Sequence, residues 1–277
     1  MDPSRSAPLI HLDNISVTYG QQAIVALHPL NISFFQGQFT VIIGPSGAGK
    51  STLLRCINFL TRPTTGTITV NRLGKLDKGH VLRKHRSNTA MVFQQHQLVP
   101  RLSVLQNVLT GRIGYHSTLR SLFPLPAAEV NIALQSLERV GLLSKTNERV
   151  DNLSGGEQQR VGIARALTQQ PRIILADEPV ASLDPATANS ILSLLHAVCK
   201  EKGLLAIVSL HQVELAKTYA DRIIGLSAGK IVLDGDSTTL TPQALDRIYN
   251  SKKDCPYIKP HICGEPYFEL QKKGADI

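Results

Sequence analysis

The chain has 277 residues, of which 42% are hydrophobic, so it can bury a substantial core in one large domain or two small ones. No apolar run approaches the roughly 18–20 residues that cross a bilayer, and the N-terminus lacks the apolar block of a secretory signal, so we expect a cytoplasmic chain. The formal charge of +9 is compatible with a nucleotide, a nucleic acid or an anionic membrane as partner, and excludes none of them.

The basic cluster and the cysteines carry little functional signal. The segment RKHR at 83–86 is expected to be solvated surface. A zinc site formed by Cys255, His261 and Cys263 is disfavoured, because its spacing matches none of the usual structural patterns. No CxxC pair occurs, so the cysteines are expected to be reduced thiols: Cys56, Cys199, Cys255 and Cys263.

The first hundred residues indicate strands and one helix. Residues 9–20 alternate between apolar and polar side chains, as in a half-buried strand. Residues 30–44 add a second alternating stretch, a turn and an unbroken apolar run ending at Gly44, which is typical of a fully buried strand. A helix is expected over 50–60, and further strands at 65–70 and 89–95.

Beyond residue 103 the pattern first becomes helical, with Gly141 as the expected end of a helix and a loop or broken helix at 113–126. After residue 153, helices and strands alternate, which favours an α/β fold with a mainly parallel sheet covered on both sides. The last 27 residues show no clear period. The expected strands lie at 172–177, 204–210, 222–226 and 230–235, and the expected helices include 186–200 and 241–249.

A glycine-rich loop follows the first buried strand and opens a helix. It fits the pattern GxxxxGK[ST], in which backbone N–H groups, a helix N-terminus and a lysine converge on phosphates while a hydroxyl holds Mg²⁺. Ser51 supplies that hydroxyl. The residues predicted to contact the nucleotide phosphates are Gly44, Pro45, Ser46, Gly47, Ala48, Gly49, Lys50, Ser51 and Thr52.

Two adjacent carboxylates end the apolar strand at 172–177. The carboxyl ends of parallel strands share one edge of the sheet with the phosphate loop. Asp177 is therefore expected to contact Mg²⁺, and Glu178 to polarise the attacking water.

A second glycine-rich helix start, LSGGEQQR, lies at 153–160. Ser154 and Glu157 form a capping box, which needs no glycine at the first helical positions. Gly155 and Gly156 are explained by an anion that approaches the open N–H groups. Because the chain's own phosphate loop already surrounds one side of its nucleotide, this second site is expected to contact ATP held by another copy.

Together these motifs resemble the ATP-binding cassette (ABC) family of transporter ATPases over nearly all of residues 8–240. That resemblance implies an ATPase domain over 1–250, with an antiparallel β subdomain, a helical subdomain at about 95–165 and a C-terminal extension at 251–277. The matching segments are GPSGAGKST at 44–52, MVFQQ at 91–95, LSGGEQQR at 153–160, IILADEP at 173–179, ASLDP at 181–185 and SLHQ at 209–212.

The resemblance also implies roles for single residues. Gln94 is expected to bind the metal and water, Glu178 to act as general base, and His211 to contact the γ-phosphate. Asp184 is expected at the interface of two cassettes, and Tyr19 to stack on adenine, although a buried core tyrosine is the alternative.

Three stretches, at 107–112, 175–185 and 209–226, are similar to the ATP-binding subunits of bacterial phosphonate importers. The implied assembly has two cassettes, two permease subunits and a periplasmic solute-binding protein, with the cassettes at the cytoplasmic face of the inner membrane. Phosphite, phosphate or another small solute remains an alternative cargo. Cassettes that act on nucleic acid are disfavoured, because they carry long coiled-coil insertions or two cassettes per chain. A plain P-loop kinase leaves the second pair of glycines unexplained.

Overall fold

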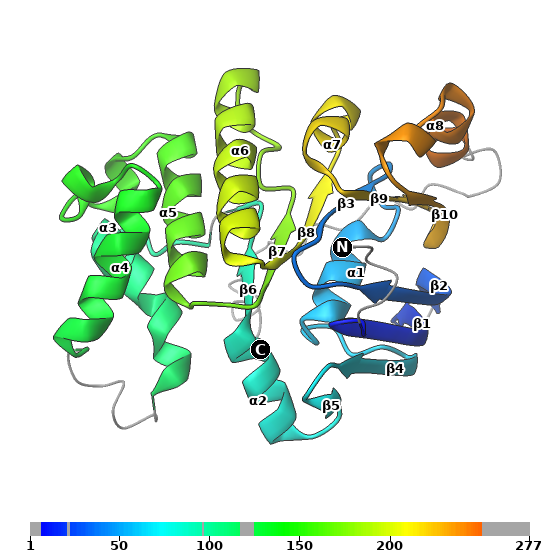
Figure 1. The fold of residues 1–277 in the computed structure, drawn as a ribbon, viewed down its shortest axis with the longest axis horizontal. Helices are drawn as coiled ribbons and strands as arrows, with labels where there is room; N and C mark the ends of the chain where they lie inside the picture. Colours follow the sequence, from blue (N-terminus) through cyan, green and yellow to red (C-terminus); the bar gives the residue numbers. More distant parts are fainter. Residues whose placement is uncertain (1–6, 21–22, 96, 117–124, 251–277) are drawn as a thin grey trace, which may run out of the picture.

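The protein is represented by a computed structural model that describes residues 7–20, 23–95, 97–116 and 125–250. Two sheets and a group of helices make up this part of the chain (Figure 1). The smaller sheet is antiparallel, in the order β2-β1-β4-β5. Its strands are β1 (Ile10–Tyr19), β2 (Ile24–Phe34), β4 (Thr65–Val70) and β5 (Gly74–Lys75).

The larger sheet has six strands in the order β10-β9-β3-β8-β7-β6. All neighbouring pairs are parallel except β9 with β10, which are antiparallel. Strand order and direction therefore confirm the expected mainly parallel α/β sheet. Its strands are β3 (Phe39–Ile43), β6 (Thr89–Val92), β7 (Ile173–Asp177), β8 (Leu205–Leu210), β9 (Arg222–Ser227) and β10 (Lys230–Gly235).

Strand β3 separates two hydrophobic cores. Val41 and Ile43 point into a core shared with the larger helices, whereas Ile42 points into a second core shared with the antiparallel sheet. Because successive side chains of a strand face opposite sides, a strand covered on both faces is buried at every position, and FTVII is apolar except for Thr40. Helix α1 (Lys50–Ile57) lies in the second core, between the two sheets (Figure 1).

The remaining helices fall into two groups. Helices α3, α4 and α5 lie together at the side of the large sheet away from the antiparallel sheet, whereas α6, α7 and α8 follow one another along the large sheet (Figure 1). Short 3-10 segments η2, η4 and η5 lie among the first group. The bounds are α2 (Gly79–Asn88), α3 (Val104–Leu109), η2 (Thr110–Tyr115), α4 (Ala127–Arg139), η4 (Leu143–Lys145), η5 (Val150–Asn152), α5 (Gly155–Thr168), α6 (Pro185–Lys202), α7 (Val213–Tyr219), η6 (Ser237–Thr239) and α8 (Pro242–Tyr249).

The structure differs from the sequence prediction at four points. Strand β2 begins at Ile24, before the expected stretch, and neither β5 nor α2 was expected. The interpretation of 83–86 as solvated surface is wrong for His85, which is fully buried and whose Nε2 lies 2.8 Å from the carbonyl oxygen of Ile57. Burial is the main cause that lowers the pKa of His85.

Other expectations hold or lie outside the described residues. Gly141 has a φ of 72° at the end of α4, as expected of a helix stop. Cys56 and Cys199 are buried free thiols, and burial raises the pKa of each to about 12. Most of the loop at 113–126, the disfavoured zinc site and the extension at 251–277 lie outside the described residues, so the boundary at residue 250 stays a prediction.

Among the helices of the described ranges, none combines the length and the apolar character that a membrane span requires.

Candidate nucleotide site

The phosphate loop links the end of β3 to α1 through backbone that only glycine adopts without strain. Gly44 has a φ of 155°, and a Cβ atom there would lie 2.1 Å from the carbonyl oxygen of Leu226. Gly49 precedes the first residue of α1 with a φ of 101°, and its Cβ would lie 2.7 Å from the carbonyl oxygen of Ala26. Close backbone packing therefore fixes this loop within one chain.

Lys50 lies inside the loop, with only 4% of its surface exposed. Its ammonium group donates hydrogen bonds to the carbonyl oxygens of Gly44 (2.9 Å) and Pro45 (3.2 Å). Glu178 Oε1 lies 3.6 Å away. Burial lowers the pKa of Lys50, and the carboxylates of Glu178 and Asp177 oppose that effect.

Asp177 and Ser51 meet at the end of β7. The hydroxyl groups of Ser51 and Ser209 each donate to Asp177 Oδ1 at 2.9 Å. Ser209 also accepts a hydrogen bond from the backbone N–H of Glu178 at 2.9 Å. Hydroxyl and carboxylate oxygens are the ligands that Mg²⁺ prefers, so the donor set that these residues form fits that ion.

Glu178 follows the strand with a φ of 49°, an unusual conformation for a residue with a side chain. Its Oε1 atom lies 2.5 Å from Nε2 of His211, which follows β8. The parallel sheet therefore brings Lys50, Glu178 and His211, which are far apart in sequence, to one cluster at its carboxyl edge.

The second glycine-rich start forms the expected capping box. Ser154 Oγ accepts from the N–H of Glu157, and Glu157 Oε2 accepts from the N–H of Ser154 at 2.9 Å. Lys145 Nζ lies 2.7 Å from the other carboxylate oxygen of Glu157. The hydrogen bond from Lys145, together with those from Ser154, lowers the pKa of Glu157 to about 2.

The two glycines of this start differ. A Cβ atom at Gly155 would meet only Leu183, at an ordinary 3.9 Å, whereas a Cβ at Gly156 would lie 2.8 Å from the side chain of Thr187. Packing against Thr187 therefore accounts for Gly156, for which the sequence alone indicates an anion because capping does not require it. Gly155 is exposed, so neither capping nor packing accounts for it, and its contact with an anion stays a prediction.

The beginnings of α5 and α6 lie next to each other through these contacts. Asp184 caps α6, and its Oδ1 accepts hydrogen bonds from the N–H groups of Ala186 (3.1 Å) and Thr187 (3.0 Å). The hydrogen bonds from Thr187 are the main cause that lowers the pKa of Asp184. Ser154, Gly155 and Asp184 are all exposed, so this pair of helix starts faces outward.

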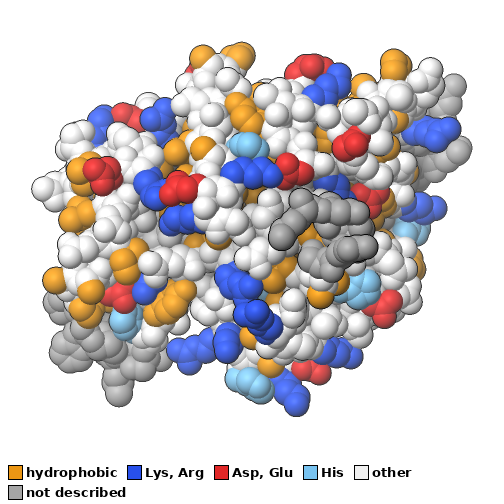
Figure 2. Space-filling view, in the orientation of Figure 1, with side chains coloured by type: hydrophobic (Ala, Val, Ile, Leu, Met, Phe, Trp, Pro, Cys, Tyr) orange, Lys and Arg blue, Asp and Glu red, His pale blue; other side chains and the backbone are white. Residues whose placement is uncertain are grey.

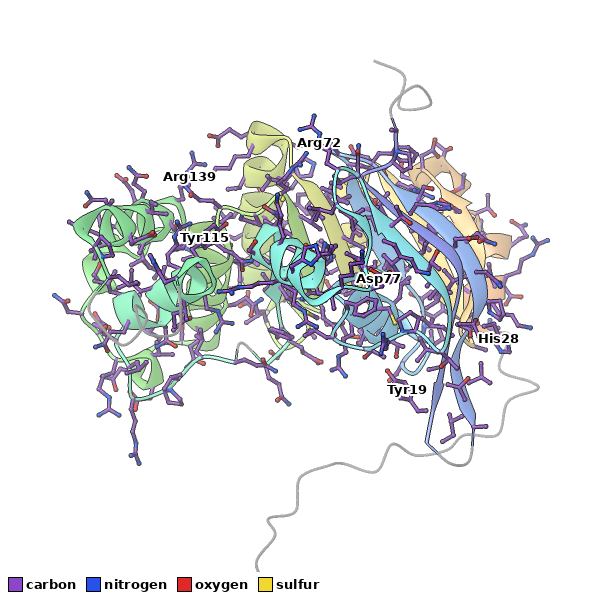
Figure 3. The ribbon with its side chains drawn as sticks, turned by 90° about the horizontal axis from the view of Figure 1, so that it is seen from below. Tyr19, His28, Arg72, Asp77, Tyr115 and Arg139 are labelled. Carbon is purple, nitrogen blue, oxygen red and sulfur yellow. The ribbon has the colours of Figure 1, made fainter. Side chains whose placement is uncertain are left out.

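Two predicted site residues lie apart from the cluster. Tyr19 lies near the end of the β1–β2 hairpin and is 41% exposed, so the alternative of a core tyrosine is wrong (Figure 3). Its hydroxyl contacts Thr61 Oγ1 at 3.5 Å. Gln94 is exposed in the turn after β6, and no hydrogen bond within the described ranges joins it to Ser51 or Asp177, so its role as metal ligand stays a prediction.

Two contributing residues were missed by sequence reasoning. Ser209 is the penultimate residue of β8, a strand that is otherwise apolar, and its position beside Asp177 follows only from the β7–β8 register. Lys145 lies twelve positions before Glu157 in a short 3-10 segment, a spacing that no helical or strand period reveals.

Comparisons with known proteins agree with this geometry. The family model described as "ABC transporter" matches residues 27–181. A phosphonates import ATP-binding protein of Nostoc sp. is 57% identical over 89% of this chain and 94% of its own length. A phosphite import ATP-binding protein of Stutzerimonas stutzeri is 54% identical over 95% of this chain and 97% of its own.

Among solved structures, a dimeric ATP-binding cassette in a post-hydrolysis state bound to ADP and phosphate is 34% identical, with a TM-score of 0.72, and the match covers 82% of this chain and 98% of that one. The family model and the curated relatives together show that this chain belongs to the ABC transporter family, as one of its ATP-binding, ATP-hydrolysing subunits.

Proposed function

We propose that this chain is the energy-coupling subunit of a bacterial importer of phosphonates. The observation that carries the enzymatic part is the contact of Lys50, Glu178 and His211 beside the Ser51–Asp177 pair. The cargo is supported by the relatives, which include phosphonates import proteins that are 57%, 55% and 52% identical.

The site residues divide the hydrolysis of ATP between them. The exposed Tyr19 holds adenine, and the phosphate-loop N–H groups and Lys50 hold the phosphates. Glu178 accepts a proton as water adds to the γ-phosphorus, the bond to the bridging oxygen breaks, and ADP and phosphate leave. His211 contacts the γ-phosphate. Mg²⁺ bound by Ser51, Asp177 and Gln94 would supply neutralisation of phosphate charge.

A second copy of the chain completes each site. The outward-facing start of α5 presents backbone N–H groups to solvent, whereas the N–H groups of Ala186 and Thr187 at the adjacent start of α6 are already bonded to Asp184. Helix N-termini favour anions, so we assign Ser154, Gly155, Gly156, Glu157 and Asp184 to ATP held by the partner copy. The dimeric relative bound to ADP and phosphate supports this arrangement.

A groove of about 410 Å³ offers a place for the permease. It lies between the end of α1, strand β6, segment η2 and helix α5, and Leu60 and Tyr115 on its walls are 50% and 44% exposed. The groove combines apolar residues with polar and basic ones, as a surface that receives an amphipathic permease helix requires. Docking there would hold the cassettes at the cytoplasmic face of the inner membrane, with a periplasmic solute-binding protein delivering cargo to two permease subunits.

Phosphite is the second candidate cargo. The phosphite import relative is 54% identical and matches 95% of this chain, a larger share than the 89% matched by the Nostoc phosphonates protein. Overall identity therefore does not separate the two oxyanions.

The test is uptake by cells from which the chain's gene is deleted. Cells that carry the wild-type chain should take up methylphosphonate, and cells that carry Glu178→Gln should not. Phosphite and phosphate, supplied separately as the phosphorus source, identify the alternative cargo. Unchanged methylphosphonate uptake in the deletion strain would reject the proposed cargo, and purified protein without ATPase activity in its assembled complex would reject the enzymatic part.

A further inference from the structure

A cavity of about 140 Å³ lies far from the nucleotide site. It is bounded by the turn after β4, by α2 and by the residues that start β7. Arg172 immediately precedes β7, whose other end is Asp177. At roughly 3.3 Å per strand residue, the five residues of β7 correspond to about 17 Å. The cavity therefore opens at the amino edge of the sheet, opposite the phosphate loop.

The floor of this cavity is apolar. Leu9 and Val70, each 4% exposed, and Ile173, 2% exposed, belong to the core beneath it, and Leu73 packs against the same core. A hydrated inorganic ion makes no favourable contact with such a floor. Small apolar groups do, because they release water from apolar surface.

The walls carry positive charge. Arg72, Lys84 and Arg172 all line the cavity, and none of them forms an ion pair with another residue of the described ranges. Within the described ranges, the Arg172 guanidinium donates to a neutral acceptor, the amide oxygen of Gln36, at 3.1 Å. Figure 2 shows Lys and Arg side chains gathered on the molecular face around α2, and Figure 3 shows Arg72 extending outward.

Among the lining residues that the structure describes, none is acidic, so this charge is not balanced by them. The remaining titratable group of the lining, His85, is occupied by its contact with the carbonyl oxygen of Ile57. Three unpaired cations above an apolar floor are complementary to an anion that carries a compact apolar group.

We propose that this cavity binds a small organic oxyanion of the alkyl- or arylphosphonate or phosphate monoester class. The apolar substituent contacts Leu9, Val70 and Ile173, and the anionic group contacts Arg72, Lys84 and Arg172. This class includes the proposed cargo, so occupancy of the cavity would follow the concentration of imported compound inside the cell. The site is distinct from the nucleotide site; its binding of such an anion does not depend on the proposed function, whereas its response to imported compound rests on it.

The experiment is calorimetric titration of the full chain with phenylphosphonate. Lys50→Ala serves as background, because it removes competition from the phosphate loop. Arg72→Gln and Arg172→Gln should each weaken binding about tenfold, as expected when one charge-assisted hydrogen bond is lost. The matched control is Lys78→Gln, an exposed lysine at the start of α2 that lies outside the cavity. Unchanged ATP affinity in Arg72→Gln and Arg172→Gln, with Lys50 intact, confirms folding.

Two further measurements, a titration with inorganic phosphate and a sedimentation assay with vesicles, distinguish the possible sources of the anion. Inorganic phosphate should bind at least tenfold more weakly than phenylphosphonate, because it leaves the floor uncovered. Equal binding of the two anions would overturn the assignment of an organic ligand. In the Lys50→Ala background, phenylphosphonate affinity that is unchanged by Arg72→Gln and by Arg172→Gln would overturn the site itself. Sedimentation with phosphatidylglycerol vesicles that depends on Arg72 and Arg172, without phenylphosphonate binding, would identify a lipid headgroup and overturn the small ligand.

Discussion

Helices α1 and α5 both begin in glycine-rich sequence, and the surrounding residues hold the two beginnings in different ways. At α1, backbone of the same chain presses against Gly44 and Gly49, and Lys50 is buried. At α5, side chains form the cap, and a Cβ atom added at Gly155 would meet no atom of the described residues closer than 3.9 Å. The first start is enclosed by its own chain. The second is open, which is what a surface completed by another molecule requires.

The largest expected effect tests the enclosed half of the nucleotide site, which is the half at the start of α1 that one chain forms by itself. Glu178→Gln cannot accept a proton from water, so ATP hydrolysis should fall about 10²–10⁴-fold while ATP binding persists. The variant should accumulate as a dimer that holds ATP between α1 of one copy and α5 of the other. Gel filtration with ATP measures this, and a variant that stays monomeric would contradict the shared site.

A matched pair of substitutions compares the two starts directly. Gly44→Ala places a methyl group against Leu226 and should destabilise the fold by about 1–3 kcal/mol. Gly155→Ala enters a helix without a clash and should leave stability equal or up to about 1 kcal/mol higher. Its methyl group nevertheless covers the N–H groups facing the partner copy, so hydrolysis should fall about 10²-fold.

Thermal unfolding and ATPase assays separate these two outcomes. Full activity in Gly155→Ala would show that the open start contacts no phosphate, and the comparison between α1 and α5 would then reduce to packing alone.

A smaller effect is expected at the adenine side of the enclosed half. Tyr19→Ala removes a stacking contact worth about 1–3 kcal/mol, so ATP affinity should weaken about tenfold. Tyr19→Phe keeps the ring and loses only the 3.5 Å contact to Thr61, so it should bind ATP as the wild type does. Titration with a fluorescent ATP analogue measures both, and equal weakening in the two variants would argue against stacking.

The smallest expected effect tests the open half of the nucleotide site, which is the exposed start of α5. Lys145→Met leaves the Glu157 carboxylate without its ion pair, so its negative charge repels the partner's ATP. Exposed pairs are worth about 0.2–1 kcal/mol, so KM for ATP should rise about two- to fivefold with kcat unchanged. Adding Glu157→Gln should restore KM, and Lys217→Met, which breaks an exposed pair with Glu214, is the control. A rise in KM that persists in the double variant would point to packing instead.

Local patterns predicted most of the large sheet and its site. The run FTVII, the phosphate loop and the strand ending in Asp177 each carry their signal within a few residues, and all were placed correctly. Helix α2 was missed because its sequence, GHVLRKHRSN, is almost entirely polar and lacks an apolar period. The burial of His85 depends on a carbonyl 28 positions earlier, which no local pattern contains.

The site was predicted less completely, for a related reason. The sequence indicates which chemical groups are present, but the contacts of Ser209 with Asp177 and of Thr187 with Gly156 arise from the register of neighbouring strands and the packing of two helices. Such distances are decided by the whole fold.

The position of Glu178 has a consequence for a subunit that carries no nucleotide. Its Oε1 atom lies near both the Lys50 ammonium and His211 Nε2, so the group assigned to the attacking water is paired with two groups assigned to the phosphates. Entry of a triphosphate must separate these groups before it can use them, and each separation costs part of the affinity gained.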